Sequence, residues 1–537
     1  MSDPEGPGLD LTPYPLPGKR VRAVGEYVPE PWRIDPKIDI DRIEYALEFR
    51  RLAGVTQVVP PQDGYLFHNR LTHSMKVASV AATIARQLVY AYEDDDVMLA
   101  EVGPLGFWVD PDYCYAAALA HDIGHPPFGH AGEQALQGLL GGTWAKPKMR
   151  AHSFEGNAQS TRILVDLSFR KLHKQGLELT QRTVAAVAKY PWLRGHHPHV
   201  VPKLARKWSF YDTESDVLKD LIDDRFIAVE RTPWSDLTAE EREALDPDGT
   251  GEWRSAGRTD RVHRWPEAEI MDWADDVSYA VHDMEDFFMS GLIPLHRITV
   301  ALRAAPGVEE FDWEQDSFSF TQNDLEVRDA LRFARDKMAE TLDENGQSLR
   351  AHVNAAFDML RANMIEAMPS RRFDGSARAH TQLHAFGSSG IRLLTENCQL
   401  EVFAVAGRPR LRFVVPPKLR LVAEFFKAIC RFYVIDTSAV RVMQAGQKRL
   451  LLELIEALLE MAGESKNQFK RVLPSRLAEF MDRGMPSTDD ADDVVRSYQL
   501  AVVDYVCSLR DAQAEQIAIA LTGRDGTLTL PGNWLDT

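Results

Sequence analysis

The chain has 537 residues, of which 45% are apolar and 26% are charged, a balance typical of globular proteins that bury a large core. The formal net charge of −18, from 62 basic and 80 acidic residues, argues against a surface built mainly to hold nucleic acid, which needs a basic stripe. The N-terminus lacks a signal core, no run approaches the roughly 20 apolar residues of a membrane span, and the four cysteines lack zinc or disulfide spacing, so we expect a cytoplasmic protein without membrane contacts.

The residue pattern predicts a mostly α-helical fold. Residues 1–35 are expected to form an irregular N-terminal arm, because repeated prolines interrupt regular structure. Beyond Ile38, apolar residues recur at three- and four-residue spacing, which is typical of amphipathic helices. The predicted helices cover residues 41–53, 72–91, 113–123, 154–173, 179–190, 266–289, 324–342, 346–367, 418–436, 447–463 and 496–521.

Three later segments complete the organisation of the chain. The polar, Gly- and Pro-punctuated residues 230–262 are expected to form a loop excursion. Residues 399–405 and 410–415 flank Ala-Gly-Arg-Pro and are rich in β-forming residues, which predicts a small β-hairpin. The helices at 418–436 and 447–463 are apolar enough for core or subunit interface, and core is the commoner explanation.

Three separated segments carry residues suited to binding a metal. His73 lies near the start of an amphipathic helix, and His121-Asp122 ends an Ala-rich helix that Gly124 and two prolines stop. Asp275, Tyr279 and Asp283 share one stripe of a third helix, where several aspartates are unusual. Two imidazoles with carboxylates form a mixed nitrogen and oxygen set that suits Mn, Fe, Co, Ni, Zn or Mg.

Each segment also has a simpler explanation. A lone histidine such as His73 is more often a cap or a surface group than a ligand, and a His-Asp pair occurs by chance in a long chain. Asp275 and Asp276 are also compatible with a solvated helix face. The argument for a metal rests on three suited clusters that occur together in one chain.

These segments resemble the HD-domain deoxynucleoside triphosphate triphosphohydrolases, in particular the bacterial dGTPase-like branch. The resemblance runs from about Asp41 to Asp286 and continues more weakly into the C-terminal helices. Its most specific motifs are HDIGHPPFGHAGE (121–133), followed by FEGNAQ (154–159). Other matching segments are DRIEYALEFRRLAGVTQV (41–58), NRLTHS (69–74), LELTQRTVAAVAKYP (177–191), KWSFYDTESD (207–216) and ADDVSYAVHDMED (274–286).

The resemblance implies a role for each matching residue. The metal ligands would be His73, His121, Asp122 and Asp275, with Asp276 as a supporting carboxylate. His130 and its partner Glu133 would be catalytic, together with His125. The substrate-binding residues would be His125 and His152 at the phosphates or bridging oxygen, Arg70, Lys189 and Lys207 at the triphosphate, and Gln57, Tyr279 and Asp283 at the deoxyribose.

The same resemblance implies a domain arrangement and partners. An HD-domain catalytic core would span residues 36–300, and residues 301–537 would form a mostly helical region packed on the core that contributes to oligomerisation. Members of this family commonly form homo-oligomers, often hexamers, and some are activated by nucleotides at a separate site, so we expect a homo-oligomer with a dNTP or single-stranded DNA as a candidate effector. Val55, Lys76 and the long segments 91–112 and 230–262 depart from the family pattern, which leaves substrate preference and regulation open.

The expected reaction is metal-dependent hydrolysis of dGTP or several dNTPs to deoxynucleoside and inorganic tripolyphosphate, with one divalent ion as cofactor. Two alternatives stay open at this point. One is an HD phosphodiesterase or nucleotidase that acts on other nucleotides. The other is a dNTP- or ssDNA-binding sensor with little turnover, against which the intact set of metal and catalytic residues argues.

Overall fold

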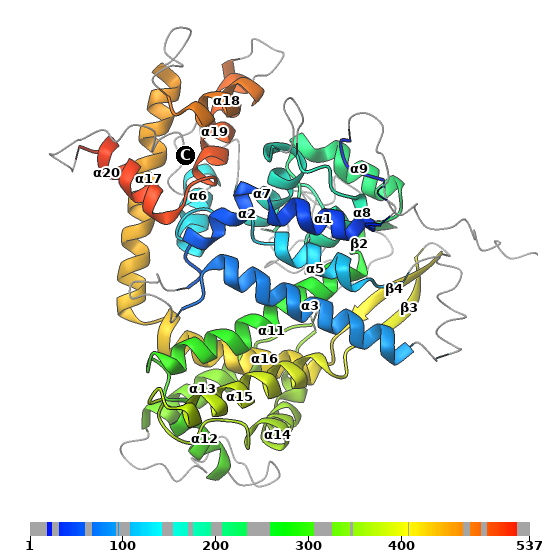
Figure 1. Ribbon diagram of the computed structural model, residues 1–537, viewed down its shortest axis with the longest axis vertical. Helices are drawn as coiled ribbons and strands as arrows, with labels where there is room; N and C mark the ends of the chain where they lie inside the picture. The colour runs from blue at the N-terminus through cyan, green and yellow to red at the C-terminus, as the bar shows by residue number, and fades with distance from the viewer. Residues whose placement is uncertain are drawn as a thin grey trace, which may run out of the picture.

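The fold is mostly α-helical, as expected from the sequence (Figure 1). In the described part of the chain, the helices are accompanied only by two antiparallel sheets of two strands each. This computed structural model describes residues 19–23, 30, 32–58, 67–92, 95, 108–141, 154–169, 176–194, 207–233, 258–304, 325–343, 347–405, 408–464, 473–484 and 491–523.

Helices form in all of the predicted helical segments, and several further helices lie between them. The helices are α1 (Asp35–Glu44), α2 (Leu47–Arg51), α3 (Arg70–Tyr92), α5 (Pro111–Ala120), α6 (His130–Gly141), α7 (Gly156–Arg162), α8 (Gln181–Val187), α9 (Ser215–Asp223), α11 (Pro266–Met289), α12 (Leu295–Ala304), α13 (Leu325–Ala339), α14 (Val353–Met364), α15 (Ala377–Thr395), α16 (Pro417–Cys430), α17 (Ser438–Glu464), α18 (Ser475–Gly484), α19 (Ala491–Val506) and α20 (Asp511–Leu521). The sequence interpretation missed α6, α9, α12, α15 and α18.

Several predicted helices are shorter or divided in the structure, among them the following two. The helix expected over 154–173 consists of α7 and a π-helical turn that ends at Leu167, because Ser168 has an extended backbone with ψ 149°. The helix expected over 496–521 is interrupted after Val506, and α20 begins only at Asp511. Apolar spacing carries across both breaks, so periodicity alone did not reveal them.

The centre of the molecule is built by α3, α5 and α11. Figure 1 shows α3 and α11 running side by side through the middle, and α5 contacts both of them. Asp110 caps α5 by accepting hydrogen bonds from the backbone amides of Asp112 and Tyr113. The residues from Ala116 to Ala120 are wholly buried, and their small side chains allow the neighbouring helices to approach closely.

The C-terminal helices cover two sides of this centre. Nine residues of α16 are buried, and α16 contacts α11, α13 and α14. The long helix α17 lies beside α6, α19 and α20 (Figure 1), and it buries a stripe that includes Leu451, Leu454 and Leu458. Burial within a single chain therefore supports the core interpretation of the segments 418–436 and 447–463.

The predicted hairpin is confirmed, and a second one corrects the expected loop at 230–262. Strand β3 (Gln399–Val405) pairs with β4 (Arg408–Val414). Strand β1 (Ala228–Pro233) pairs with β2 (Arg258–His263), so the two ends of the segment 230–262 form an antiparallel pair of strands. The backbone pairing of two segments that are distant in the sequence is a tertiary property, which a polar composition does not reveal.

Some expectations lie outside the described residues. These are the arm at 1–18, most of the segment 91–112, residues 234–257 and His152. Within the described chain, no helix is both long and apolar enough to cross a membrane. All four cysteines are free thiols, as expected.

Candidate functional site

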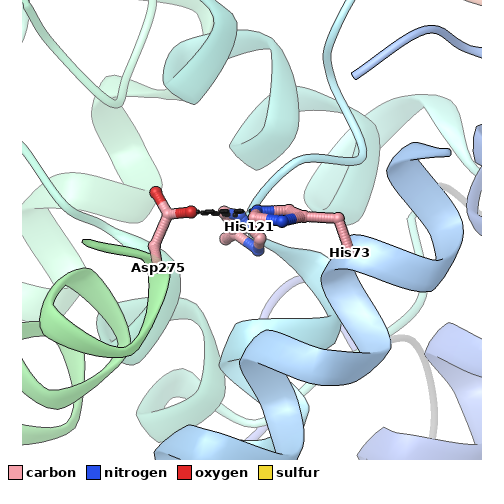
Figure 2. Close-up of side chains that lie close together, drawn as sticks. All are labelled: His73, His121 and Asp275. Atoms are coloured by element: carbon pink, nitrogen blue, oxygen red, sulfur yellow. Dashed lines mark hydrogen bonds and ion pairs between the residues drawn. The ribbon is translucent and has the colours of Figure 1, made fainter. Parts of the chain in front are cut away.

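Three of the four predicted metal ligands converge from different helices. His73 lies in the first turn of α3, His121 directly follows α5, and Asp275 lies in the middle of α11 (Figure 2). One potential ligand atom of each lies within 4.8 Å of the other two. The Nε2 atom of His73 is 3.0 Å from Asp275 Oδ1, and the Nε2 atom of His121 is 3.6 Å from the same oxygen. The packing of α3, α5 and α11 thus brings together residues that are far apart in the sequence.

The orientation of His121 favours a cation. Its Nδ1 atom lies 2.6 Å from the carbonyl oxygen of Ala118 and donates a hydrogen bond to it, so Nε2 is the atom that carries the lone pair when the ring is neutral. That Nε2 atom is buried and has no hydrogen-bond partner in the described structure. Burial opposes the charged form, but Asp122 and Asp275 outweigh it and raise the pKa of His121 to about 9. The same negative field attracts a divalent metal ion, so the donor set fits one.

Asp122, the fourth predicted ligand, lies beside this group and connects it to other parts of the site. Its Oδ1 atom is 3.4 Å from His121 Nε2 and 3.1 Å from His125 Nδ1. Its Oδ2 atom accepts a hydrogen bond from the guanidinium of Arg70. Although burial opposes ionisation, His121, His125 and Arg70 hold the pKa of Asp122 well below its usual value. An ionised carboxylate at this point can bind a metal through Oδ1 while Arg70 holds Oδ2.

The predicted catalytic residues form a second group beside the first. His130 Nδ1 is 2.9 Å from Glu133 Oε2 across the first turn of α6, and His125 Nε2 is 3.7 Å from Glu133 Oε1. Burial opposes ionisation of Glu133, but His125 and His130 outweigh it and lower its pKa. The side chain of His130 is 56% exposed, while that of Glu133 is 9% exposed. The arrangement thus gives an accessible imidazole whose inner nitrogen is held by a buried carboxylate.

The turn between His121 and His130 depends on two glycines. A Cβ atom on Gly124 would lie 2.2 Å from the backbone nitrogen of Ser160, so only glycine lets α7 pass this closely. Gly129 has φ +54°, and a Cβ atom there would lie 2.8 Å from both Arg70 and the Thr56 carbonyl oxygen. Phe128 also has a left-handed backbone, with φ +64°. This turn brings His125 and His130 to the same side of the site.

The three predicted cations surround these groups, and each is held by a carboxylate. Arg70 donates to Asp122, and Lys207 Nζ lies 2.8 Å from Glu155 Oε1. Lys189 Nζ lies 2.5 Å from Asp272 Oδ1 and 3.7 Å from Asp275 Oδ2. Although burial opposes the charge on each, the neighbouring carboxylates raise the pKa of Arg70, Lys189 and Lys207 above its usual value. All three are therefore positively charged at neutral pH.

The residues expected at the sugar lie along the same helices. The ring of Tyr279 packs edge-on against His73, with 5.1 Å between ring centroids. Burial, Asp286 and Asp275 raise the pKa of Asp283 well above its usual value. Gln57 is buried, and neither its Nε2 nor its Oε1 atom has a hydrogen-bond partner in the described structure. A buried amide without partners needs an explanation, and a bound ligand supplies one.

Two carboxylates that hold the lysines were not singled out from the sequence. Asp272 precedes Asp275 by three residues on α11, so helical spacing would have placed both on one face. Glu155 lies within the quoted FEGNAQ motif and caps α7 by accepting from the backbone amides of Asn157 and Ala158. Arg264, which precedes α11, binds Asp272 at 2.7 Å. No helical spacing or motif in the sequence indicated this contact.

Residue Asp276 does not face the metal group. Its Oδ1 atom is 3.2 Å from Lys427 Nζ on α16. Lys76, a departure from the family pattern, lies near Glu285, Asp286 and Asp283, and burial lowers the pKa of its ammonium group despite these carboxylates. Asp276 therefore pairs with a neighbouring helix, and Lys76 lies in the field of the carboxylates of α11.

Comparisons with known proteins show which proteins this chain is similar to. Residues 70–191 match the HD domain model, a range that includes His73, His121, Asp122, His130 and Lys189. A deoxyguanosinetriphosphate triphosphohydrolase-like protein of Streptomyces coelicolor is 31% identical over 520 residues, which cover 93% of this chain and 96% of that protein. A protein of the same name from Corynebacterium diphtheriae is 28% identical over 430 residues, 78% of this chain and 79% of that protein. A "-like protein 2" of Mesorhizobium japonicum is 35% identical over 271 residues, about half of each chain.

Proposed function

The chain belongs to the HD-domain, deoxyguanosinetriphosphate triphosphohydrolase-like family, and we propose that it hydrolyses deoxynucleoside triphosphates to deoxynucleoside and inorganic tripolyphosphate. One observation carries this proposal. A convergent His73, His121 and Asp275 group lies beside a His130–Glu133 pair, and cationic side chains surround both. Metal ligands alone fit many phosphoesterases, whereas several cations around one site match the charge of a triphosphate.

We propose that His73, His121, Asp122 and Asp275 hold one divalent ion, for which Mn, Mg, Fe, Co, Ni and Zn are candidates. When bound, such an ion stabilises charge on phosphate oxygens and lowers the pKa of a bound water. The protein contributes the geometry, because the Ala118 carbonyl fixes the ring of His121 and Arg70 fixes Asp122.

We propose that Arg70, Lys189 and Lys207 bind the triphosphate. Each cation is already held in place by Asp122, Asp272 or Glu155, so little side-chain entropy is lost when the phosphates bind. The positive charges also offset the negative charge that accumulates in the transition state.

The proposed reaction breaks the bond between the α-phosphorus and O5′. Water attacks the α-phosphorus, and the departing deoxynucleoside alkoxide takes up a proton to become the free 5′-hydroxyl. His130 is suited to supply this proton, because Glu133 accepts from Nδ1–H and orients the ring, so that the accessible Nε2 is free for proton transfer. His125, which lies between Asp122 and Glu133, is placed to bind a phosphate or bridging oxygen.

We propose that Gln57, Tyr279 and Asp283 recognise the deoxyribose. The unpartnered amide of Gln57 can both donate to and accept from a sugar hydroxyl. The Tyr279 ring, held against His73, gives a flat wall. A wall without room at C2′ would exclude a ribonucleotide.

The deciding experiment is incubation of the purified protein with each dNTP, with GTP, and with a deoxynucleoside monophosphate and a cyclic nucleotide, in Mn and in Mg separately, followed by anion-exchange separation of the products. Deoxynucleoside with intact tripolyphosphate is the expected outcome. Monophosphate with pyrophosphate, or stepwise phosphate release, would contradict the proposed bond cleavage. Hydrolysis of monophosphate or cyclic nucleotides alone would favour a phosphodiesterase or nucleotidase, and binding without turnover would favour a sensor.

A further inference from the structure

Asp511, the first residue of α20, contacts two segments of the candidate site that precede it by several hundred residues. Its Oδ2 atom accepts hydrogen bonds from the backbone nitrogen of Thr56 at 2.9 Å and from Thr56 Oγ1 at 2.5 Å. Its Oδ1 atom accepts from the backbone nitrogen of Phe128 at 2.8 Å. One carboxylate therefore joins the segment before α3 to the turn before α6.

Both of these segments carry groups of the candidate site. Thr56 pairs with Asn69 in an isolated antiparallel bridge. The carbonyl oxygen of Thr56 accepts from Nη2 of Arg70 at 3.5 Å. Phe128 begins the turn that leads through Gly129 to His130. The left-handed backbone of Phe128, φ +64°, costs free energy in a residue other than glycine, so it needs fixed partners. Asp511 supplies one by accepting from its amide.

The connection between α19 and α20, which immediately precedes Asp511, is itself held against the same turn. Arg51 donates to the carbonyl oxygens of Leu509 at 2.8 Å, Ile123 at 3.0 Å and His125 at 2.8 Å. Burial lowers the pKa of Arg51 to about 10, so it stays charged at neutral pH. A Cβ atom on Gly54 would lie 2.7 Å from Cδ of Arg510, so a glycine there allows this close approach.

We propose that Asp511 is a positioning residue, which sets the relative placement of Arg70 and His130 through Thr56 and Phe128. The proposal rests on the proposed function, because positioning is measured through turnover. Asp511 touches no reacting group in this arrangement and acts through the backbone. The alternative is that Asp511 only stabilises the start of α20, where an acidic residue interacts favourably with the helix dipole.

The test compares Asp511→Ala with Thr56→Val, Thr56→Ser and the control Glu326→Gln. Asp511→Ala removes all three hydrogen bonds, Thr56→Val removes only the hydroxyl bond, and Thr56→Ser keeps it. Glu326 lies in the first turn of α13, so Glu326→Gln removes a comparable helix-start charge far from these contacts. The measurements are kcat and KM for the best dNTP, metal content, melting temperature and deuterium exchange of peptides covering 54–58, 124–131 and 511–521.

We expect Asp511→Ala to lower kcat at least about tenfold with KM within about threefold, because displaced catalytic groups slow the reaction more than they weaken binding. Thr56→Val should show a smaller loss, and Thr56→Ser and Glu326→Gln should retain the kcat of the unaltered protein. Exchange should rise in the two peptides. A lowered melting temperature with kcat unchanged would overturn the proposal, and so would an exchange increase confined to α20. If the unaltered protein hydrolyses no dNTP, the proposed function fails, whereas the exchange data still decide whether Asp511 holds the two segments.

Discussion

The hydroxyl oxygen of Tyr279 lies 3.3 Å from Nε2 of His130, on the opposite side of the ring from Glu133. Glu133 is ionised and only accepts, so Nδ1 of His130 carries the proton that faces it. Burial raises the pKa of Tyr279 well above its usual value, so its hydroxyl keeps its proton and donates to a neutral Nε2. The accessible Nε2 atom is thus the position at which His130 gains and loses a proton.

His130→Ala should lower kcat for dNTP hydrolysis about 100-fold or more, the usual size of a general-acid contribution. Metal content should stay unchanged, because the ligand atoms of His73, His121 and Asp275 form a separate group. Turnover assays and elemental analysis of the purified variants measure the two quantities. His121→Ala is the matched comparison, and it should lose metal as well as turnover. Loss of metal from His130→Ala would show that His130 binds the ion or holds the site together.

Glu133→Gln should lower kcat about tenfold at neutral pH. The amide can still accept from Nδ1–H of His130, but a hydrogen bond to a neutral acceptor is weaker than one to a carboxylate, so the ring is held less firmly. The kcat of Glu340→Gln, which alters an exposed glutamate beside Lys337, should match that of the unaltered protein. Steady-state kinetics of the two variants give the comparison. An unchanged kcat in Glu133→Gln would remove Glu133 from the proposed proton transfer.

Local spacing predicted only part of the site. Asp275 and Tyr279 lie on a predicted helix at positions that share one face, so their proximity follows from helical geometry. The pairing of His130 with Glu133 came from the family resemblance, because α6 was not among the predicted helices. The resemblance likewise supplied the set of metal residues, whereas apolar periodicity predicted the helices that carry His73 and Asp275.

Contacts between distant segments could not be predicted in the same way. The bonds from Asp511 to Thr56 and from Lys189 to Asp272 depend on how helices pack, and no local pattern specifies them. The pairing of β1 with β2 has the same cause, because 24 residues that are outside the described chain separate the strands. Helix α15 was not predicted, because Gly387 and Gly390 interrupt its apolar pattern. These positions need small residues, because they pack closely against Glu285 and Val281.

Lys207→Gln should reduce both stability and activity, and a second substitution should separate the two effects. Glu155 is wholly buried and holds Lys207, so Lys207→Gln leaves a buried carboxylate without its cation, at a cost of about 1–3 kcal/mol. In Glu155→Gln/Lys207→Gln, the amide oxygen can still cap α7 and most of the stability should return. kcat/KM should stay lowered about tenfold or more, because one phosphate contact of roughly 1.5–3 kcal/mol is missing. Urea unfolding and steady-state kinetics test this, and full recovery of kcat/KM in the double variant would exclude phosphate binding by Lys207.

Glu285→Gln should make the protein more stable at pH 8 but not at pH 4. Burial raises the pKa of Glu285 to about 7. The negative charge of Asp286 adds to this effect, and the positive charge of Lys76 partly offsets it. His68 is the remaining charged neighbour, and on the α15 side Glu285 packs against Gly387. Because the unfolded chain releases this proton at lower pH than the folded protein does, the stability contributed by Glu285 falls as pH rises from about 4.5 to about 7. The difference in the free energy of unfolding between the variant and the unaltered protein, measured by urea unfolding, should grow to roughly 3 kcal/mol across that pH window. An equal difference at both pH values would contradict the raised pKa.

Arg162→Met should destabilise the protein by about 3–5 kcal/mol, the usual cost of breaking a buried ion pair from one side. The Arg162 side chain is buried, and its guanidinium binds Asp504 of α19 at 3.0 Å and Glu214 at 2.7 Å, so the substitution leaves two carboxylates without their cation. Arg449→Met removes an exposed pair with Glu453 and should cost no more than about 0.5 kcal/mol. Urea unfolding of both variants gives the comparison. Asp504 lies near the end of α19, and Asp511 begins α20 directly after the short connection. Since Asp511 binds the amide of Phe128, loss of the Arg162 contact should also raise deuterium exchange in the peptide 124–131. A stability within about 1 kcal/mol of the unaltered protein would mean that this network does not anchor the C-terminal helices to α7.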